Sequence, residues 1–264
     1  MDKKILLKVR NLTRVFGSKK KRVVAVKNVS FDIYENEIIS IVGESGSGKT
    51  TTARMMLNLL KPTEGTIEIE GEDISNFRGK KKREYWRKVQ GIFQDPFASF
   101  NQFFTVRKVL DDSFKLFDVQ PSKEEKDKRI RKVLEYVNMR YEEVAEKYPF
   151  ELSGGQRQRI MIARIFLIEP KLLIADEPTS MIDAVLRSSI LELLLSLRER
   201  EKSSIVFITH DLGLAYYVSD RILIMHNGEL VEQGSADDII TNPQHPYTKK
   251  LIQDVPTLHQ EWAL

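Results

Sequence analysis

The chain reads Gly43-Glu44-Ser45-Gly46-Ser47-Gly48-Lys49-Thr50-Thr51 directly after the apolar run Ile38-Ile39-Ser40-Ile41-Val42. An apolar-faced helical segment, residues 52–60, follows. The order strand, glycine-rich loop, helix is the context of a phosphate-binding loop. Glycines let the backbone approach an anion closely, and the N–H groups at the positive end of the helix favour negative charge. We expect Lys49 to reach the β- and γ-phosphates of a nucleotide and Thr50 to bind Mg²⁺. A glycine-rich turn with a surface lysine is the alternative.

A second helix start also contains glycines. Leu152-Ser153-Gly154-Gly155-Gln156 opens the helical pattern of residues 157–168. Ser153 and Gln156 have the spacing of a capping box. Each glycine costs a helix about 1 kcal/mol relative to alanine, so a purely structural helix start rarely contains two. An anion that approaches the backbone there would explain the pair. One bound nucleotide needs only one such loop, so the second requires a separate explanation.

Two other apolar runs end in ionisable side chains. Leu172-Leu173-Ile174-Ala175 precedes Asp176-Glu177-Pro178, and Ile205-Val206-Phe207-Ile208-Thr209 precedes His210-Asp211. In an open parallel α/β sheet, ligands collect at the carboxyl ends of the strands. Successive side chains of an extended backbone point in different directions, so we expect different roles for Asp176 and Glu177. A polar strand end and a structural histidine are the alternatives.

These motifs, in this order, resemble those of the ATP-binding cassette (ABC) ATPases, and the resemblance covers nearly the whole chain. It implies an α/β fold: a P-loop NTPase (RecA-like) core with an N-terminal antiparallel β layer and an inserted α-helical lobe. In that family the signature serine and glycines, here within Ser153-Gly154-Gly155-Gln156, bind the γ-phosphate of ATP held by the partner subunit. The resemblance therefore implies that two chains pack head to tail and sandwich two ATP molecules.

The resemblance also assigns roles to individual side chains. Asp176 would hold the Mg²⁺ shell, and Glu177 would activate or orient the attacking water. His210 would contact the γ-phosphate. Gln94, within Gly91-Ile92-Phe93-Gln94-Asp95-Pro96, would contact Mg²⁺ or the water and begin the linker into the helical lobe. A buried turn glutamine is the alternative for Gln94.

Two further assignments concern Phe16 and the segment of residues 180–183. Phe16 would stack on the adenine ring, where the family more often has tyrosine, although an isolated aromatic can equally belong to the core. Ser180-Met181-Ile182-Asp183 resembles the loop that crosses the dimer interface. Met181 and Ile182 depart from its usual Ser-Ala-Leu-Asp form while staying apolar. Asp183 alternatively caps the helix expected over residues 183–197.

We expect one ABC ATPase domain over residues 1–264. Residues 1–96 and 151–231 would form the catalytic core with the β layer, residues 97–150 the helical lobe, and residues 232–264 a C-terminal tail. Period-two alternation at residues 29–34 and strand-like runs at 5–9 and 23–26 predict the β layer. A helical run over residues 123–137 predicts the lobe, and Asn227-Gly228 predicts a hairpin.

The tail contains Asn242-Pro243-Gln244-His245-Pro246-Tyr247-Thr248, which resembles the tail of ATPases from oligopeptide/dipeptide-type importers. These importers pair two different ATPases, and Gln156 makes the chain resemble the F-type partner. The resemblance implies a second ABC ATPase subunit (a heterodimer, with a homodimer as the alternative), two transmembrane permease subunits and, indirectly, an extracytoplasmic substrate-binding protein. The cargo would be peptide, with oligosaccharide and nickel as alternatives. The cysteine-containing extension that holds an iron–sulfur cluster in some members is missing, so we expect no cluster.

The composition limits the remaining possibilities. The absence of cysteine excludes disulfides and thiolate metal sites, and the net charge of +4 is a mild excess that does not demand nucleic acid. No apolar run approaches the roughly 18 residues that span a bilayer. We expect a peripheral protein at the cytoplasmic face of the membrane.

Two rival functions remain as alternatives. One is an ABC-type ATPase acting on nucleic acid or ribosomes, and the other is a regulatory nucleotide-binding module without turnover. The intact Lys49, Asp176, Glu177 and His210 argue against the regulatory module.

Overall fold

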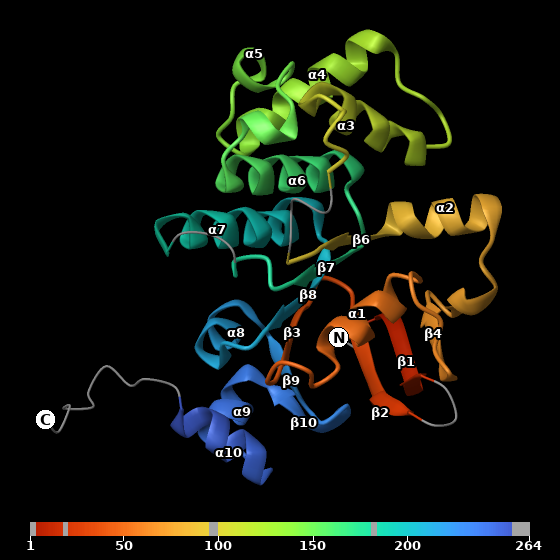
Figure 1. The fold of residues 1–264 in the computed structure, drawn as a ribbon, viewed down its shortest axis with the longest axis vertical. Coiled ribbons are helices and arrows are strands. Elements are labelled where there is room, and N and C mark those ends of the chain that lie inside the picture. The colour runs from red at the N-terminus through yellow and green to blue at the C-terminus, as the bar shows by residue number, and fades with distance from the viewer. Residues whose placement is uncertain (1–3, 18–20, 95–99, 181–183, 255–264) are drawn as a thin grey trace, which may run out of the picture. The chain divides into compact units, whose positions relative to one another are not determined.

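The computed structural model describes residues 4–17, 21–94, 100–180 and 184–254 (Figure 1). The chain divides into two compact units, residues 1–75 with 206–264 and residues 76–205. Among the described residues, no helix combines the length and the apolar character that a membrane span requires.

The first unit contains two sheets with flanking helices. One sheet has the strand order β2-β1-β4-β5, and the other includes the order β10-β9-β3-β8, with β3 parallel to β9 and β9 antiparallel to β10. The elements are β1 (Ile5–Phe16), β2 (Val23–Tyr34), β3 (Ile38–Val42), α1 (Lys49–Met56), β4 (Glu64–Ile69), β5 (Glu72–Asp73), η1 (Ile74–Asn76, which ends at the boundary), β8 (Ser204–Thr209, of which residues 206–209 belong here), α8 (Leu212–Val218), β9 (Arg221–His226), β10 (Glu229–Ser235), α9 (Ala236–Thr241) and α10 (Pro246–Gln253).

The antiparallel sheet confirms the predicted β layer, but its strands are longer than the sequence indicates. The runs at residues 23–26 and 29–34 are one strand, β2, which passes through Asn28 at φ 51°. Asn11 of β1 has φ 50°, and the β1–β2 register shifts near both residues. Asparagine tolerates the left-handed region better than most residues, so both strands continue through these bulges.

The strand that leads into the phosphate loop (residues 43–51) is fully buried. All five residues of β3 are buried, and Val42 belongs to an apolar cluster with residues from α8, β9, α9 and α10. The following helix, α1, begins at Lys49 and ends at Met56, earlier than the predicted segment 52–60. Asn58, at φ 53°, adopts a left-handed conformation that stops the helix.

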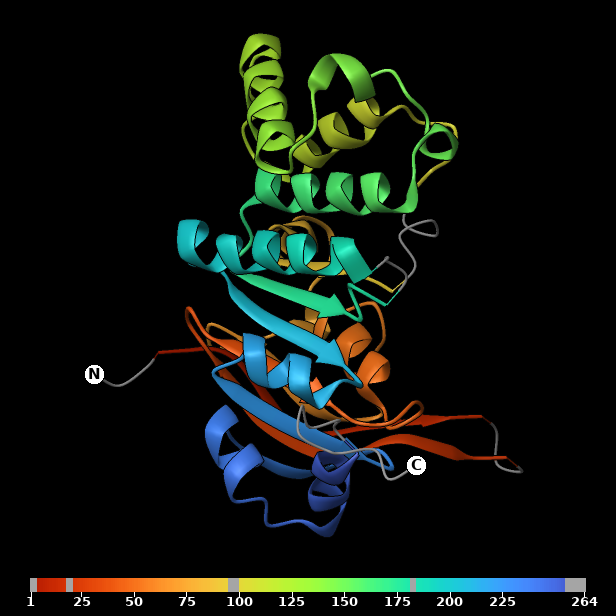
Figure 2. The same ribbon diagram turned by 90° about the vertical axis from the view of Figure 1, so that its left-hand side faces the viewer.

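The second unit contains a short parallel sheet and most of the helices. Strands β6 and β7 pair in parallel from Val89 opposite Leu172 to Ile92 opposite Ala175. The elements are α2 (Gly79–Lys88), β6 (Val89–Ile92), α3 (Val106–Ser113), η2 (Phe114–Leu116), α4 (Lys123–Tyr136), α5 (Tyr141–Val144), η3 (Pro149–Glu151), α6 (Gly154–Ile168), β7 (Leu172–Asp176) and α7 (Ala184–Glu201). Helices α3, α4 and α7 each contact α6, and Figure 2 shows α6 and α7 side by side.

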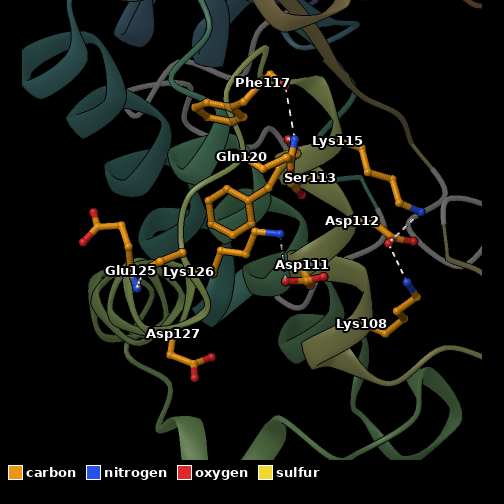
Figure 3. Close-up of polar contacts among 12 residues, drawn as sticks. Lys108, Asp111, Asp112, Ser113, Lys115, Phe117, Gln120, Glu125, Lys126 and Asp127 are labelled. Carbon is orange, nitrogen blue, oxygen red and sulfur yellow. Dashed lines mark hydrogen bonds and ion pairs between the residues drawn. The ribbon is translucent and has the colours of Figure 1, made fainter.

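Helices α3 and α4 confirm helical structure within residues 97–150. Figure 3 shows Asp112 between Lys108 and Lys115, at 2.7 and 2.9 Å from their ammonium groups, and Lys126 of α4 at 3.9 Å from Asp111 of α3. Exposed ion pairs of this kind stabilise by less than about 1 kcal/mol. The helices are held mainly by apolar side chains without solvent exposure, namely Leu110, Phe114, Ile130 and Leu134. The lobe boundaries, residues 97–150, remain a prediction, since the two units divide elsewhere.

Candidate nucleotide-binding site

The phosphate loop is closely packed in the first unit, and two of its glycines are sterically required. A Cβ atom on Gly43 would lie 2.1 Å from the Met225 carbonyl oxygen. Gly48 caps α1 at φ 102°, and a Cβ there would lie 2.4 Å from the Ala25 carbonyl oxygen. Any side chain at either position would displace the loop from β2 or β9. The glycines therefore fix the loop against its own unit.

Lys49 is buried inside this loop at 6% exposure. Its ammonium group donates to the carbonyl oxygens of Gly43, at 2.6 Å, and Glu44, at 2.8 Å. An ammonium group binds phosphate oxygens more strongly than it binds neutral carbonyl oxygens, so an incoming phosphate would compete with these two carbonyls for Lys49. The buried Ser47 hydroxyl lacks a hydrogen-bond partner in the described structure, whereas Glu44, Ser45, Gly46 and Thr50 are exposed and Thr51 is half-buried.

Phe16 and His210 also belong to the first unit. Phe16 ends β1 with 38% exposure, and the Arg14 guanidinium lies 4.6 Å from its ring centroid. The core interpretation of Phe16 is therefore wrong, because the ring is at the surface. His210 is exposed directly after β8. Asp211 beside it caps α8, accepting from the Leu214 N–H at 3.0 Å.

The second unit holds the two carboxylates and Gln94. Asp176 is the last residue of β7 and is 4% exposed, while Glu177 is half-buried at φ 47°. A left-handed conformation is uncommon for glutamate and marks a turn of the chain directly after the strand. The expectation of different roles for Asp176 and Glu177 stays a prediction. The exposed Gln94 donates from Nε2 to Glu177 Oε2 at 3.4 Å. Gln94 is thus no buried turn residue, and it lies beside the Glu177 carboxylate. Its predicted contact with Mg²⁺ or the water stays a prediction.

Sequence reasoning missed Gln158, which connects the turn after β7 to α6. Its side chain, 2% exposed, donates to the Pro178 carbonyl oxygen at 3.0 Å. Ser180 also closes this turn, with its hydroxyl donating to the Glu177 carbonyl oxygen at 3.0 Å. A polar residue on the buried face of a helix is the signal that could have found Gln158, because buried amides require partners.

The signature segment (residues 152–156) forms the predicted capping box. Ser153 Oγ accepts from the Gln156 N–H at 3.2 Å, and Gln156 Oε1 accepts from the Ser153 N–H at 2.9 Å. A Cβ on Gly154 would meet no atom within 4 Å, and its backbone is outside the left-handed region. Packing within the described chain therefore gives no reason for glycine at 154.

The predicted site residues divide between the two units, and the structure shows a contact between two of them from distant segments, Gln94 and Glu177. The phosphate loop, Phe16 and His210 lie in the first unit, and Gln94, Asp176, Glu177 and the signature segment lie in the second. The predictions for Met181, Ile182 and Asp183, and for Asp95 and Pro96, lie outside the described residues.

A glycine-rich loop joining a buried parallel strand to a helix, in a chain with an acidic strand end, defines a P-loop nucleoside triphosphatase. Residues 26–180 match the family described as ABC transporter, and residues 231–264 match the oligopeptide/dipeptide transporter C-terminal region. The chain belongs to the ABC transporter family, as an ATPase of the oligopeptide/dipeptide type. This confirms the predicted family, the ATPase activity and the relationship of the tail.

Several curated proteins are similar over nearly the whole chain. The oligopeptide transport ATP-binding protein OppF of Streptococcus mutans is 41% identical over 97% of this chain and 83% of its own length. OppF of Bacillus subtilis is 40% identical, covering 95% and 82%. The dipeptide transport ATP-binding protein DppF of Lactococcus lactis is 39% identical, covering 97% and 83%. These relatives agree with the predicted F-type subunit.

Solved structures confirm the predicted fold class. The ATP-binding cassette MJ0796, a dimer in a post-hydrolysis state bound to ADP and Pi, has a TM-score of 0.79 and 30% identity, covering 88% of this chain and 99% of that chain. CbiO1 from Clostridium perfringens, part of the ABC transporter complex CbiONQ, has a TM-score of 0.76 and 27% identity, covering 90% and 92%.

Proposed function

We propose that this ATPase powers the uptake of peptides through a membrane importer. The match of residues 231–264 to the oligopeptide/dipeptide transporter C-terminal region carries this proposal, because it distinguishes this chain from cassettes in general. The relatives named OppF and DppF support peptides over oligosaccharide or nickel. The chain would bind, at the cytoplasmic face of the membrane, two permease subunits that receive cargo from an extracytoplasmic binding protein.

ATP would bind to the phosphate loop, with Phe16 against the adenine ring. Lys49 would exchange its carbonyl partners for phosphate oxygens, and loop N–H groups from Gly46 to Thr51 would surround the phosphates. The surface position of Phe16 supports stacking, since the ring needs no rearrangement of the core. His210, exposed after β8, would contact the γ-phosphate.

The donor set fits Mg²⁺, which prefers hard oxygen ligands. Thr50 offers an exposed hydroxyl, Asp176 a buried carboxylate and Gln94 an exposed amide oxygen. In the described parts of the chain, no three His, Asp or Glu side chains form a metal cluster. Mg²⁺ is commonly held by one or two carboxylates together with substrate phosphates, and we propose that arrangement for Asp176 and ATP. When bound, Mg²⁺ would offset the charge that develops on the phosphate oxygens.

Glu177 would orient the attacking water and accept its proton. The turn that carries Glu177 is fixed by Ser180 and, through Pro178, by Gln158, while Gln94 contacts the carboxylate itself. Such preorganisation places the base without reorganisation at the moment of reaction. Gln94 would then connect the state of the nucleotide to the segment that follows it.

The signature segment would act on ATP held by another ATPase subunit. In the capping box Ser153 Oγ accepts a hydrogen bond, so its O–H can still donate to a phosphate. The space beside the Cα atom of Gly154 is open, because a Cβ there would meet no atom within 4 Å. The dimer of MJ0796 with ADP and Pi supports a two-subunit site. The partner would be a second, different ATPase, with a homodimer as the alternative.

Substitution of Glu177 by glutamine tests the chemistry. We expect ATP binding to persist while turnover falls about 10²–10⁴-fold, the usual effect of removing a positioned acid or base. The variant should accumulate as an ATP-bound dimer in size-exclusion chromatography. Turnover near the wild-type rate would contradict the role of Glu177.

Copurification from the native membrane tests the transport function. Two membrane proteins and a second ATPase are the expected partners. Recovery of rRNA or DNA in their place would favour the rival function on nucleic acid or ribosomes.

A further inference from the structure

The C-terminal segment contacts the phosphate loop through one tyrosine. Tyr247, in the first turn of α10, is 8% exposed, and its hydroxyl oxygen accepts a hydrogen bond from the Glu44 N–H at 3.1 Å. The ring stacks on His226 with centroids 3.9 Å apart and an interplanar angle of 28°. Tyr247 also shares a buried cluster with Val42, the last residue of β3. The ring therefore belongs to the core, its hydroxyl reaches the exposed edge of the phosphate loop at Glu44, and both residues lie within the first unit.

The tail motif builds the position of this tyrosine. Glu232 of β10 accepts from the backbone N–H groups of Gln244, at 2.7 Å, and His245, at 3.0 Å. His245 then caps α10, with Nδ1 accepting from the Tyr247 N–H at 3.2 Å, and Pro246 begins the helix. These hydrogen bonds fix the start of α10, and so the backbone position of Tyr247, relative to β10.

The hydrogen bond from Glu44 fixes a particular peptide group. The Gly43 carbonyl and the Glu44 N–H belong to the same planar trans peptide and point in opposite directions. The carbonyl accepts from Lys49 Nζ at 2.6 Å, and the N–H donates to the Tyr247 hydroxyl. The peptide plane is thus held on both sides, by a lysine and by a tyrosine 203 residues distant from Glu44.

We propose that Tyr247 is a positioning residue that holds the phosphate loop in its ATP-binding conformation. The inference rests on the proposed ATP site. When Lys49 turns to the phosphates, the Gly43 carbonyl loses that partner, and Tyr247 is the side chain among the described residues that still holds the peptide. The hydrogen bond to Tyr247 would then stabilise the loop more in the ATP-bound state than in the free state. Such a difference between the two states is what changes the affinity for ATP.

Substitution of Tyr247 by phenylalanine removes the acceptor and keeps the ring that stacks on His226. We expect the Kd of the purified full chain for N-methylanthraniloyl-ATP to rise about two- to tenfold, the equivalent of one net hydrogen bond. The KM for ATP, measured on the chain assembled with its partner ATPase, should rise by a similar factor. The rate at saturating ATP should stay within about twofold of wild type. Without nucleotide, amide exchange at Glu44 should accelerate, which reports the contact independently of turnover.

Substitution of Tyr216 by phenylalanine is the matched control. It removes another tyrosine hydroxyl of the first unit, which donates to Asp237 of α9 at 3.0 Å and not to the phosphate loop. Its Kd and Glu44 exchange should equal those of wild type. If wild type binds the probe but Y247F shows the same Kd and the same amide exchange at Glu44, the role of Tyr247 is refuted while the ATP site stands. Failure of wild type to bind the probe would instead overturn the ATP site, and equal weakening in Y216F would show a non-specific effect and refute the role of Tyr247.

Discussion

Substitution of Gly154 by alanine should separate the stability of this protein from its catalysis. The first residue of α6 is Gly154, and a Cβ there would meet no atom within 4 Å. Alanine is preferred to glycine in a helix by up to about 1 kcal/mol, with less expected in the first turn. For a chain of this size, 1 kcal/mol corresponds to about 2–4 °C in Tm. We expect the Tm to stay constant or to rise by at most a few degrees.

The same methyl group should impair hydrolysis. If the backbone of the signature segment binds the γ-phosphate of the neighbouring subunit's ATP, a methyl group at 154 would lengthen or break a hydrogen bond to a charged group. Such a bond contributes about 1.5–3 kcal/mol, so the ATPase rate should fall roughly 10- to 150-fold. ATP binding by the isolated chain should be unchanged, because the phosphate loop lies in the other unit.

Thermal unfolding, nucleotide binding and steady-state ATPase assays on one preparation test this reasoning. Substitution of Gly234 by alanine is the control, since a Cβ there would make an ordinary contact, 3.6 Å from Ile239 Cδ1. Its activity should match wild type. Full turnover in G154A would refute the approach of a phosphate to this backbone, and a clear fall in Tm would refute the open space around Gly154.

Two other predictions follow from the same structure. Ser153→Arg should leave ATP binding by the lone chain intact and abolish dimer-dependent hydrolysis, measured by titration and by phosphate release; loss of binding by the monomer would contradict the two-subunit site. Burial by itself would raise the pKa of Glu232, but hydrogen bonds from groups including the amides of Gln244 and His245 hold that pKa below its ordinary value of 4.5. The carboxylate therefore stabilises the folded tail fully above about pH 4.5 and progressively less as the pH falls below it. The difference in unfolding free energy between wild type and Glu232→Gln should be constant above that pH and shrink below it. A difference that grows as the pH falls would refute the lowered pKa of Glu232.

The predictable part of the site consists of short segments. The phosphate loop, the capping box of Ser153 and Gln156, and the carboxylates after Leu172-Leu173-Ile174-Ala175 each depend on neighbours in the chain. Steric freedom at glycine, hydrogen bonding within one helical turn, and the position of a polar residue at a strand end are local effects. They can be deduced from spacing alone.

Contacts between distant residues required the structure. Gln94 and Glu177 are separated by 83 positions, and no periodicity places an amide beside that carboxylate. Gln158 and Pro178 meet because α6 packs next to the turn after β7. The sequence predicts a strand that stops at residue 9, before Asn11, and two separate strands on either side of Asn28, because a bulge interrupts the alternation on which the prediction depends.

The sequence by itself determined which residues can bind phosphate, carry a base and cap the helices, because these capacities are properties of side chains and their immediate backbone. Only the tertiary structure decided that the tail motif reaches the phosphate loop, that Gly43 and Gly48 are packed against other strands, and that Gly154 is not. The physical reason is that packing brings together atoms whose separation along the chain carries no information about their distance in space.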